Sequence, residues 1–488
     1  MKDLRAAPAT LGLRLDREGG EPLFRQIAEQ LRGGIQAGRL ASGSRLPAER
    51  LLARALGVNR TTVLAAYNEL KREGLVSGHV GRGTEVVASA QAGTSAALPW
   101  SDVLRLAPAF DPLIRDLLGM NDPDLVSLAL GMPAADLLPL AELARLHAEV
   151  LAQVGAPALM HSPTEGLLAL REALAERLQP RGIQAAPQEV LVTNGSQQAL
   201  DLVARVLLSP GDTVVIEEPT YVGMLQALRA AGARLVSVPV DGEGLRVDRL
   251  ESLLARVKPR LIYTLPTFQN PSGAVMSLAR RRRLLELAAR HQVPVVEDDP
   301  YSDLSYDGQA PPPLKALDTK GLVFHVSTVS KTLCPGLRLG WLVGPAAVVR
   351  QLALAKQVAD LHPATLGQHV LARVLREGVL DRHLARVRRE YARRRDALLE
   401  ALAGTARLGV DWATPAGGIF VWGRLPAGMS MARLLAEAAR ERVAFLPGGV
   451  CSEDGSAAHA VRLTFSACLL YTSPSPRDRT RSRMPSSA

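Results

Sequence analysis

Cysteine is scarce in this sequence: its 488 residues include three, Cys334, Cys451 and Cys468. Their odd number and the lack of a Cys-x-x-Cys pair argue against a disulfide framework and against a structural zinc site. We therefore expect Cys334 and Cys451 to be buried free thiols.

Long apolar runs are also missing. Arg, Glu or Pro interrupts every Leu- and Ala-rich stretch before it reaches the roughly 18 residues of a membrane-spanning helix. Residues 1–5 lead into no apolar segment, so we expect no secretory signal and a cytoplasmic protein. The histidines His325, His362 and His369 have no spacing typical of metal ligands, and we expect no metal site.

Charge is distributed unevenly along the chain. The net charge is +10, yet the middle of the chain is nearly neutral. Residues 1–90 carry 14 basic and 9 acidic side chains, and residues 467–488 carry 4 and 1. An excess of this size is most often a solvated surface. We also expect the arginine runs 280–283 and 393–395, which lie in helical patterns, to face solvent.

The chain divides into four segments. Residues 1–87 combine helical periodicity with a Gly-rich hairpin, and residues 88–110 are small and polar, as in a linker. Residues 111–466 alternate short β-branched runs with longer helices, which predicts an α/β fold with a mainly parallel sheet. Residues 467–488, rich in Pro, Ser and Arg, are interpreted as a disordered, non-native tail, with a nucleic-acid-binding tail as the alternative. The strand candidates in the third segment are 189–193, 213–216, 234–238, 260–264, 293–297 and 322–327.

Three helices are expected in the first segment. Pro22 opens the first, Pro47 precedes the second, and Asn59 is a good N-cap for the third. The residues expected to face inward are Leu23, Ile27, Leu31 and Ile35, then Leu51, Leu52, Ala55 and Leu56, and finally Val63, Ala66, Tyr67 and Leu70.

The third helix leaves Arg60, Thr61 and Thr62 exposed at its start. Two short helices around a Gly turn, the second presenting Arg and Thr, suit the major groove of DNA. Residues 75–86 then alternate around glycines and predict a hairpin wing that presents Arg82. Periodicity alone does not separate this pattern from other three-helix scaffolds.

The exact residues are more specific. The motif resembles the GntR-type winged helix-turn-helix over about 65 residues, and it reads Leu40-x-x-Gly43-x-x-Leu46-Pro47-x-x-Arg50-x-Leu52-Ala53-x-x-Leu56-Gly57-Val58-x-Arg60-x-Thr62-Val63. The resemblance implies that this segment binds a double-stranded DNA operator. The implied contacts are Arg50, Arg60, Thr61, Thr62 and Gly81, with Arg45 and Arg82 on phosphates.

The chemistry of the large segment centres on Lys331. This lysine follows an apolar strand and stands in Ser330-Lys331-x-x-x-Pro335-Gly336-x-Arg338. Such a loop lies at the carboxyl edge of a parallel sheet, where α/β sites form. A lysine amine there is useful if it forms a Schiff base with an aldehyde partner.

Two further features suit that partner. Asp298 ends a buried strand, and a buried carboxylate requires a positive partner such as a pyridinium nitrogen. Residues 194–198 stand between a strand and a helix start, where backbone N–H groups suit a phosphate. Taken alone, residues 194–198 are more simply an ordinary Gly turn, and residues 270–273 a β-turn.

The combined order of motifs resembles the class I/II aminotransferases of fold-type I, over residues from about 110 to 466. The motifs are Gly131-x-Pro133, Ser162-Pro163-Thr164-Glu165-Gly166, Asn194-Gly195-Ser196-Gln197-Gln198, Glu218-Pro219-x-Tyr221, Asn270-Pro271-Ser272-Gly273, Asp298-x-x-Tyr301, the Lys331 loop through Gly340, and Arg462-Leu463. The resemblance implies an α/β transferase domain that binds pyridoxal 5'-phosphate and ends in a small α+β subdomain.

The resemblance also implies a role for each matched residue. Lys331 would form the Schiff base, Asp298 would pair with the ring nitrogen, and Tyr221 would stack on the ring. Asn270 and Tyr301 would bind the phenolic oxygen. Arg462, beside Gly131, would receive a substrate or effector carboxylate. The implied phosphate ligands are Gly195, Ser196, Gln197, Thr328, Ser330 and Arg338.

Two departures from the family pattern stand out. Where the family has a tyrosine donated to the partner subunit's phosphate, this chain has His161, whose imidazole can still donate a hydrogen bond. The pattern is also lost just after residue 467, where a closing helix is expected.

The order of the two segments is that of MocR/GabR-type regulators, which the chain resembles over residues 20–466. In that family the aminotransferase fold senses the cofactor, or an amine or amino acid joined to it, and a homodimer reads DNA. One alternative is an active aminotransferase, for example toward 2-aminoadipate or an aromatic amino acid, with an accessory DNA-binding domain. Another is a sensor of the cofactor alone.

Overall fold

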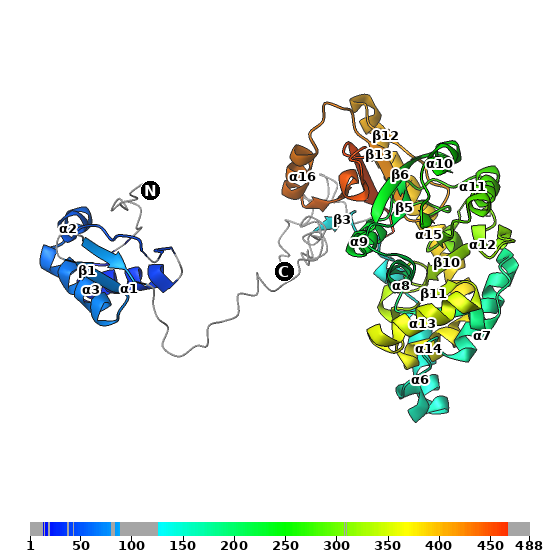
Figure 1. The fold of residues 1–488 in the computed structure, drawn as a ribbon, viewed down its shortest axis with the longest axis horizontal. Helices are drawn as coiled ribbons and strands as arrows, with labels where there is room; N and C mark the ends of the chain where they lie inside the picture. Colours follow the sequence, from blue (N-terminus) through cyan, green and yellow to red (C-terminus); the bar gives the residue numbers. More distant parts are fainter. Residues whose placement is uncertain are drawn as a thin grey trace, which may run out of the picture. The chain divides into compact units, whose positions relative to one another are not determined.

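A computed structural model of the chain describes residues 13, 15–17, 20–36, 39–41, 43–79, 83–87, 125–306, 308 and 310–466. The chain divides into two compact units, Met1–Arg105 and Leu106–Ala488, each of which is described by itself (Figure 1). The predicted linker, the predicted tail and Cys468 lie outside the described residues.

The first unit contains three helices and a hairpin. Its elements are α1 (Leu23–Gln36), α2 (Glu49–Leu56), α3 (Arg60–Arg72), β1 (Val76–His79) and β2 (Gly83–Val86). The third helix buries Val63, Ala66, Tyr67 and Leu70, as predicted. Gly57 ends α2 with a positive φ of 63°, and the Asn59 side chain accepts a hydrogen bond from the backbone N–H of Thr61. The helix-turn-helix therefore forms where the motif placed it.

The prediction for the inward face of α2 was partly wrong. Leu51 and Ala55 are exposed, whereas Leu52 and Ala53 are buried. The helix has only two turns, and its axis is fixed by packing against α3 and by Pro47, whose carbonyl accepts the hydrogen bond of the buried Tyr67. The apolar stripe read from the sequence is therefore rotated by about one residue.

The hairpin is antiparallel, with Val76 opposite Val86 and His79 opposite Gly83. Arg45 forms an isolated bridge to Glu85, which fastens the segment before α2 to the hairpin. Gly81 and Arg82, at the predicted wing tip, lie outside the described residues.

The second unit is built on an eight-stranded sheet in the order β4-β11-β10-β9-β8-β5-β6-β7. Pairs among β10, β9, β8, β5 and β6 are parallel, whereas β11 and β7 run antiparallel to their neighbours. The strands are β4 (Val190–Thr193), β5 (Thr213–Glu218), β6 (Arg234–Asp241), β7 (Gly244–Leu245), β8 (Leu261–Thr264), β9 (Val295–Asp298), β10 (Val323–Thr328) and β11 (Gly340–Val343). Five of the six predicted strands are confirmed to within two residues at each end. The sixth, β6, extends three residues beyond its predicted end.

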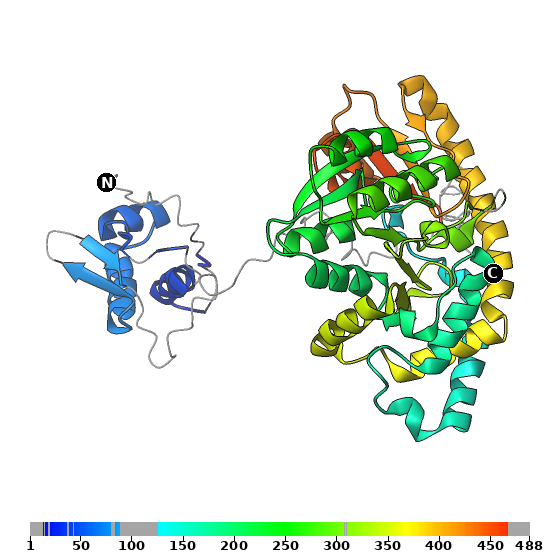
Figure 2. The same cartoon turned by 45° about the vertical axis from the view of Figure 1, so that its right-hand side comes forward.

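Helices cover both faces of this sheet (Figures 1 and 2). Alternate strand residues enter opposite cores. Leu191, Val296 and Leu342 pack with α8, α9 and α13, whereas Val192 and Val343 face the other way. The helices are α6 (Leu140–Val154), α7 (Leu168–Leu178), α8 (Ser196–Leu207), α9 (Val222–Ala230), α10 (Val247–Leu254), α11 (Leu278–His291), α12 (Leu314–Leu317), α13 (Ala346–Asp360), α14 (Thr365–Arg376), α15 (Val379–Leu402) and α16 (Met431–Arg440).

A smaller α+β part follows α15. Its four-stranded sheet has the order β12-β13-β16-β15, and α16 packs on it through Met431, Leu434 and Leu435. A separate parallel pair joins β14 to β3, so residues before α6 complete this part. The strands are β3 (Val126–Ser127), β12 (Asp411–Trp412), β13 (Phe420–Arg424), β14 (Val443–Ala444), β15 (Leu446–Pro447) and β16 (Ala460–Thr464).

The expectation that both arginine runs face solvent was partly wrong: Arg282 and Arg393 are exposed, but other members of the runs are not. Arg281 is fully buried and donates hydrogen bonds to the carbonyls of Met276, Pro266 and Pro312. Arg394 and Arg395 are buried as well. Each of these guanidiniums also donates to a carbonyl distant in the sequence, so the run of basic residues gave no sign of burial.

Candidate functional site

The predicted site residues meet at the carboxyl edge of the large sheet. Asp298 is the last residue of β9, Thr328 is the last residue of β10, and Lys331 follows three positions later. Parallel neighbouring strands end at the same edge, so the fold brings the carboxylate and the amine to one place.

Asp298 is buried and has one hydrogen-bond partner. The phenol of Tyr263 on β8 donates to its Oδ2 at 2.8 Å. The other oxygen, Oδ1, is a buried acceptor without a partner among the described residues. Burial raises the pKa of Asp298 to about 7, although the hydrogen bond from Tyr263 lowers it. An oriented, unsatisfied carboxylate oxygen fits the expected pyridinium N–H.

The amine of Lys331 donates a hydrogen bond to the backbone carbonyl of Gly131 at 2.6 Å. Burial, together with the nearby cations Arg462 and Arg338, lowers the pKa of Lys331 to about 8, although Asp298 acts in the opposite direction. A lysine with a pKa near neutrality has a substantial unprotonated fraction. It can therefore act as a nucleophile toward an aldehyde.

A cradle formed by glycines, Arg338 and a helix end lies at the N-terminus of α8. Gly195, with φ of 78°, is its N-cap, and Ser196 is its first residue. A Cβ on Gly195 would lie 2.7 Å from Nη2 of Arg338, and a Cβ on Gly340 would lie 2.6 Å from the backbone nitrogen of Ser196. Only glycines allow the guanidinium and the helix end to approach this closely. Together they suit a phosphate dianion.

Two predicted phosphate ligands, Thr328 and Ser330, are buried and joined to each other. The Thr328 hydroxyl donates to the carbonyl of Leu339 and lies 2.9 Å from Oγ of Ser330. Arg338 has a left-handed backbone with φ of 51° and donates to the carbonyl of Asn194 at 3.2 Å. The Lys331 loop is thereby tied to the residue that precedes Gly195.

Tyr221, which directly precedes α9, lies near Asp298, Arg338 and Arg462. Its hydroxyl donates to Oε1 of Gln197 at 3.1 Å, and the Gln197 amide donates to the carbonyl of Gly223. Burial and the nearby Asp298 raise the pKa of Tyr221 to about 12, although the cations Arg462 and Arg338 lower it. Its phenol therefore stays neutral near pH 7.

Arg462 on β16 is buried and lies close enough to Lys331 to lower the pKa of its amine. Its Nη1 donates to Oδ1 of Asn270 at 2.8 Å, its Nη2 donates to the carbonyl of Ala129 at 2.6 Å, and its Nε has no partner among the described residues. The guanidinium lies over the ring of Phe420, 4.0 Å from its centroid. A buried cation with an unsatisfied donor suits an incoming carboxylate.

Asn270 and Tyr301 also lie together, with the amide of Asn270 3.4 Å from the Tyr301 hydroxyl. A Cβ on Gly131 would collide with the Phe420 ring at 2.6 Å, so glycine is needed beside Arg462. The structure thus brings the cofactor residues predicted from the sequence, Gly131 and Arg462 into one site, and their arrangement fits the expected group.

His161, the departure from the family pattern, contacts another histidine. Its Nδ1 lies 2.7 Å from Nε2 of His362, whose Nδ1 lies 2.8 Å from the carbonyl of Pro363. His161 is exposed. It therefore contacts this chain's own loop and remains open to a partner.

Two neighbours of the site were missed by the sequence interpretation. Tyr263, the partner of Asp298, lies in a buried strand whose pattern does not distinguish it from core residues. Asp360 accepts hydrogen bonds from the side chains of Asn194, Gln198 and Lys356, and so braces the start of the cradle. Its partners come from the turn before α8, from α8 and from α13, and no local motif marks it.

The DNA-binding candidates lie on the exposed side of the first unit. Arg45, Arg50, Arg60 and Thr61 are exposed, and Thr62 is half-buried. Arg60 is paired with a carboxylate: its Nη2 lies 3.0 Å from Oε2 of Glu49 at the start of α2. Binding to DNA would therefore require Arg60 to exchange Glu49 for its target.

Cys451 is buried, as predicted, whereas Cys334 is half-buried. Burial raises the pKa of Cys451 to about 11, so its thiol is protonated. Within the described residues, no group of three His, Cys, Asp or Glu could hold a metal ion. No helix in that part of the chain has the length and apolar character to cross a membrane.

Comparison with known proteins identifies both units. The model of aminotransferase class I and II matches residues 123–469, and that of bacterial regulatory proteins of the gntR family matches residues 23–86. Together these matches cover both units of the chain.

Similar full-length proteins have the same order of parts. An uncharacterised HTH-type transcriptional regulator of Bacillus subtilis, YisV, is 35% identical over 92% of this chain and 93% of its own length. The probable rhizopine catabolism regulatory protein MocR of Rhizobium meliloti is 34% identical, over 82% of this chain and 80% of its own.

A solved structure resembles the second unit. The α-aminoadipate aminotransferase LysN of Thermus thermophilus, complexed with N-(5'-phosphopyridoxyl)-L-leucine, is 39% identical and has a TM-score of 0.71. The match covers 76% of this chain and 94% of LysN. The chain therefore belongs to the MocR-type transcriptional regulators, in which a GntR-type winged helix-turn-helix is joined to an aminotransferase class I/II domain.

Proposed function

We propose that this regulator binds pyridoxal 5'-phosphate at Lys331 and that an amino acid reaching this site changes how the protein binds its DNA operator. One observation carries the proposal: the chain joins an exposed DNA-reading helix to a site with a nucleophilic lysine and a buried carboxylate receptor. A ligand at the Lys331 site can affect DNA binding only if the two units are energetically coupled. Such a protein acts in the cytoplasm.

The chain's residues divide the work on the cofactor. When bound, pyridoxal phosphate supplies an aldehyde that condenses with amines and a ring that accepts electrons. Asp298, oriented by Tyr263, holds the ring nitrogen, and Asn270 and Tyr301 hold the phenolic oxygen. Tyr221 covers the ring. Gly195, Ser196, Gln197, Thr328, Ser330 and Arg338 enclose the phosphate.

The effector is an amino acid because Arg462 is placed for a carboxylate. Its Nε has no hydrogen-bond partner among the described residues, and the Lys331 amine donates to the carbonyl of the nearby Gly131. A group that can bind a carboxylate therefore lies beside the amine. An amino acid can contact both at once. A simple amine would leave the buried Arg462 without an anion.

We also propose a homodimer. Large apolar side chains are exposed on the last turns of α13 and in the segment before His161: Leu159, Met160, Leu354, Val358 and Leu361. Val358 is 91% exposed. The His161–His362 contact joins these two segments, so both belong to one region of the surface. A dimer would place two winged helices on two half-sites of one operator.

The second candidate function is amino-group transfer itself. The observation in its favour is that Lys331, with a pKa of about 8, is poised to move a proton as well as to hold the cofactor. On this view the DNA-binding unit would be accessory.

Two experiments test these proposals. Borohydride reduction of the yellow holoprotein, followed by peptide mapping, should place the pyridoxyl label on Lys331, and a label on any other lysine would refute the assignment. Incubation with amino acids, followed by absorbance spectroscopy and analysis for 2-oxo acids, separates the two functions. A regulator should show little or no 2-oxo acid, whereas catalytic turnover would favour the enzyme.

A further inference from the structure

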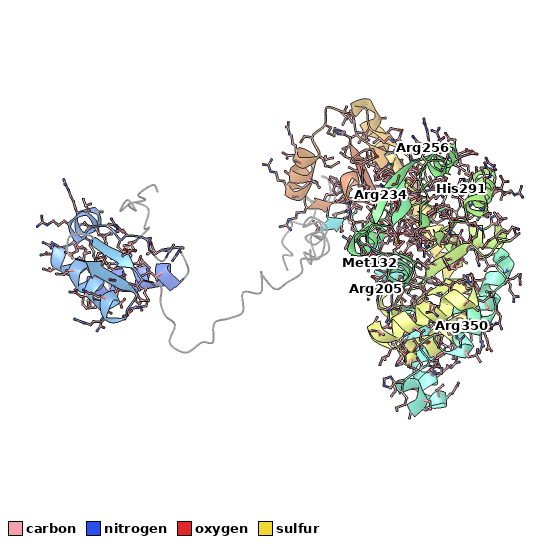
Figure 3. All side chains as sticks on the ribbon, viewed as in Figure 1. Met132, Arg205, Arg234, Arg256, His291 and Arg350 are labelled. Atoms are coloured by element: carbon pink, nitrogen blue, oxygen red, sulfur yellow. The ribbon has the colours of Figure 1, made fainter. Side chains whose placement is uncertain are left out.

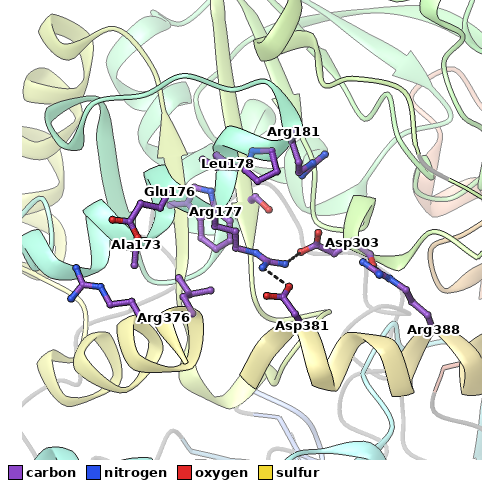
Figure 4. Close-up of a pocket in the computed structure, with 13 residues that line it drawn as sticks. Ala173, Glu176, Arg177, Leu178, Arg181, Asp303, Arg376, Asp381 and Arg388 are labelled. Atoms are coloured by element: carbon purple, nitrogen blue, oxygen red, sulfur yellow. Dashed lines mark hydrogen bonds and ion pairs between the residues drawn. The ribbon is translucent and has the colours of Figure 1, made fainter. Parts of the chain in front are cut away.

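A second cavity lies in the aminotransferase-like unit, apart from the cofactor residues. It has a volume of about 430 Å³ and is lined by α7, α14, α15 and the ends of two strands (Figure 4). Its polar lining includes Arg177, Arg181, Arg376, Arg388, Ser327 and Trp341. None of these residues belongs to the cofactor site described above.

The cavity lies behind the cofactor site, across the sheet. Ser327 pairs with Trp341, and the next pair is Thr328 with Gly340. Side chains of successive strand residues point to opposite faces. Thr328 and Gly340 therefore face the cofactor cradle, whereas Ser327 and Trp341 face the cavity.

Most charges around the cavity are already paired. Arg177 lies 2.8 Å from Asp303 and 2.9 Å from Asp381 (Figure 4). Arg181 pairs with the buried Asp299 at 2.8 Å. Burial alone would raise the pKa of Asp299, but Arg181 and other neighbours outweigh it, so the pKa of Asp299 is lowered. Arg376 pairs with Glu172 at 3.2 Å, outside the lining. These arginines are held in place and largely neutralised.

Two donor groups in the lining, the half-buried Arg388 guanidinium and the buried Trp341 indole, differ from these paired arginines. Arg388 donates from Nε to the backbone carbonyl of Asp303 at 2.6 Å, yet within the described part of the chain no carboxylate lies in ion-pair range of it. The indole N–H of Trp341 is buried without a hydrogen-bond partner there, and this side chain is only 6% exposed. A buried donor left unpaired costs about 1–3 kcal/mol. A ligand that accepts from it would recover that cost.

The chemistry that satisfies both donors is a carboxylate. Its negative charge supplies the anionic partner that Arg388 lacks among the described residues, and its two oxygens can accept hydrogen bonds from the guanidinium and from the indole N–H. Apolar side chains of Leu178, Leu375 and Ala173 complete the lining and suit a short aliphatic chain. The exposed Glu176 lies with Arg376 at the end of the pocket away from Arg388 (Figure 4), where it does not oppose an anion at Arg388.

We propose that this cavity is a second ligand site, which binds a small aliphatic carboxylate through Arg388 and Trp341. The site is distinct from the amino-acid site at Arg462. Ser327 and Trp341, which line the cavity, are next to Thr328 and Gly340 on the same two strands. A ligand in the cavity therefore contacts the strands that hold the cofactor cradle.

The test uses full-length holoprotein labelled with 5-fluorotryptophan. Trp341 is one of four tryptophans, and its ¹⁹F signal is assigned from its loss in Trp341→Phe. The protein is titrated with acetate, succinate, n-butylamine and inorganic phosphate. We expect succinate and acetate to shift the Trp341 signal saturably, and n-butylamine and phosphate not to shift it.

Arg388→Gln should weaken the carboxylate affinity about tenfold or more, since a charge-assisted hydrogen bond is lost. Arg350→Gln, on the exposed side of α13 (Figure 3), is the matched control and should leave the titration unchanged. Arg462→Gln should also leave the Trp341 shift intact, which separates this site from the cofactor site. Unchanged signals of the other three tryptophans verify folding of each variant, except that Trp422, which pairs with Arg462 across the small sheet, is left out of this check for Arg462→Gln.

A shift caused by phosphate alone, a carboxylate shift that survives Arg388→Gln, or no shift at high millimolar carboxylate would each overturn the proposal. Loss of the shift in Arg462→Gln would mean that the signal reports the cofactor site, and would overturn it too.

Discussion

The hydroxyl of Tyr263 lies 2.8 Å from Oδ2 of Asp298 and donates a hydrogen bond to it. Because Tyr263 binds only this oxygen, Oδ1 of the same carboxylate has no partner among the described residues and can accept from a ligand. Asp298 is buried at the end of β9, and burial favours its neutral form. The phenol opposes this effect by donating to the ionised form. Tyr263 is therefore a positioning residue for the proposed contact with the ring nitrogen.

Tyr263→Phe should weaken cofactor binding about tenfold. Without the phenol, the pKa of Asp298 rises above its present value of about 7, so less carboxylate is ionised at neutral pH. Hydrogen bonds to charged groups are worth about 1.5–3 kcal/mol. Absorbance titration of the cofactor-free protein with pyridoxal phosphate measures the effect. Tyr67→Phe, which removes a buried phenol from the other unit, is the control, and equal affinities for the two variants would contradict the role.

The rate of cofactor capture should depend on pH with an inflection near 8. Burial and two cations lower the pKa of Lys331, so the amine is mostly protonated below pH 8 and mostly neutral above it. Only the neutral amine attacks the aldehyde, and the rate should fall about tenfold per pH unit well below the pKa. Stopped-flow mixing of the cofactor-free protein with pyridoxal phosphate tests this. A rate that still rises as steeply above pH 9 as below pH 8 would show an unshifted lysine.

Gly340→Ala should abolish the phosphate cradle. The new Cβ would lie 2.6 Å from backbone atoms of Gly195 and Ser196, which cannot move as a flexible side chain does. We expect a loss of about 2 kcal/mol or more in stability, as in overpacked sites, and much weaker cofactor binding. Thermal unfolding with and without cofactor measures both. Gly428→Ala, where a Cβ meets nothing within 4 Å, should behave as wild type, and a Gly340→Ala protein with full cofactor affinity would refute the cradle.

Glu49→Gln should tighten DNA binding. In the structure Glu49 pairs with Arg60 at 3.0 Å, and Arg60 must leave it to contact DNA. An exposed pair of this kind is worth at most about 1 kcal/mol, so the gain is up to about fivefold. Glu29→Gln removes the same charge from the same unit without freeing Arg60, and it serves as the control in fluorescence anisotropy titrations. If both variants gain equally, the effect is net charge and Arg60 has no special role.

Residues with local sequence signals were predicted well. The strand end at Asp298, the lysine loop and the N-cap at Asn59 follow from periodicity and turn chemistry within a few residues. The positions that were wrong or missed depend on partners distant in the chain. Arg281 is buried because carbonyls from several loops surround it. Arg60 pairs with Glu49 of the preceding helix, and Tyr263 donates to Asp298, which lies 35 residues later in the chain.

The most direct test of the account is the DNA affinity of holoprotein with and without amino acids, measured by anisotropy on an operator selected from random DNA. In the wild type, the effective amino acid should change the dissociation constant at least about fivefold, since coupling free energies are typically about 1–3 kcal/mol. Arg462→Ala should bind DNA normally without the effector and lose the response, because the carboxylate receptor is gone. An Arg462→Ala protein that responds at the wild-type concentration would contradict the account, and the effector would then be the cofactor itself or an amine without a carboxylate.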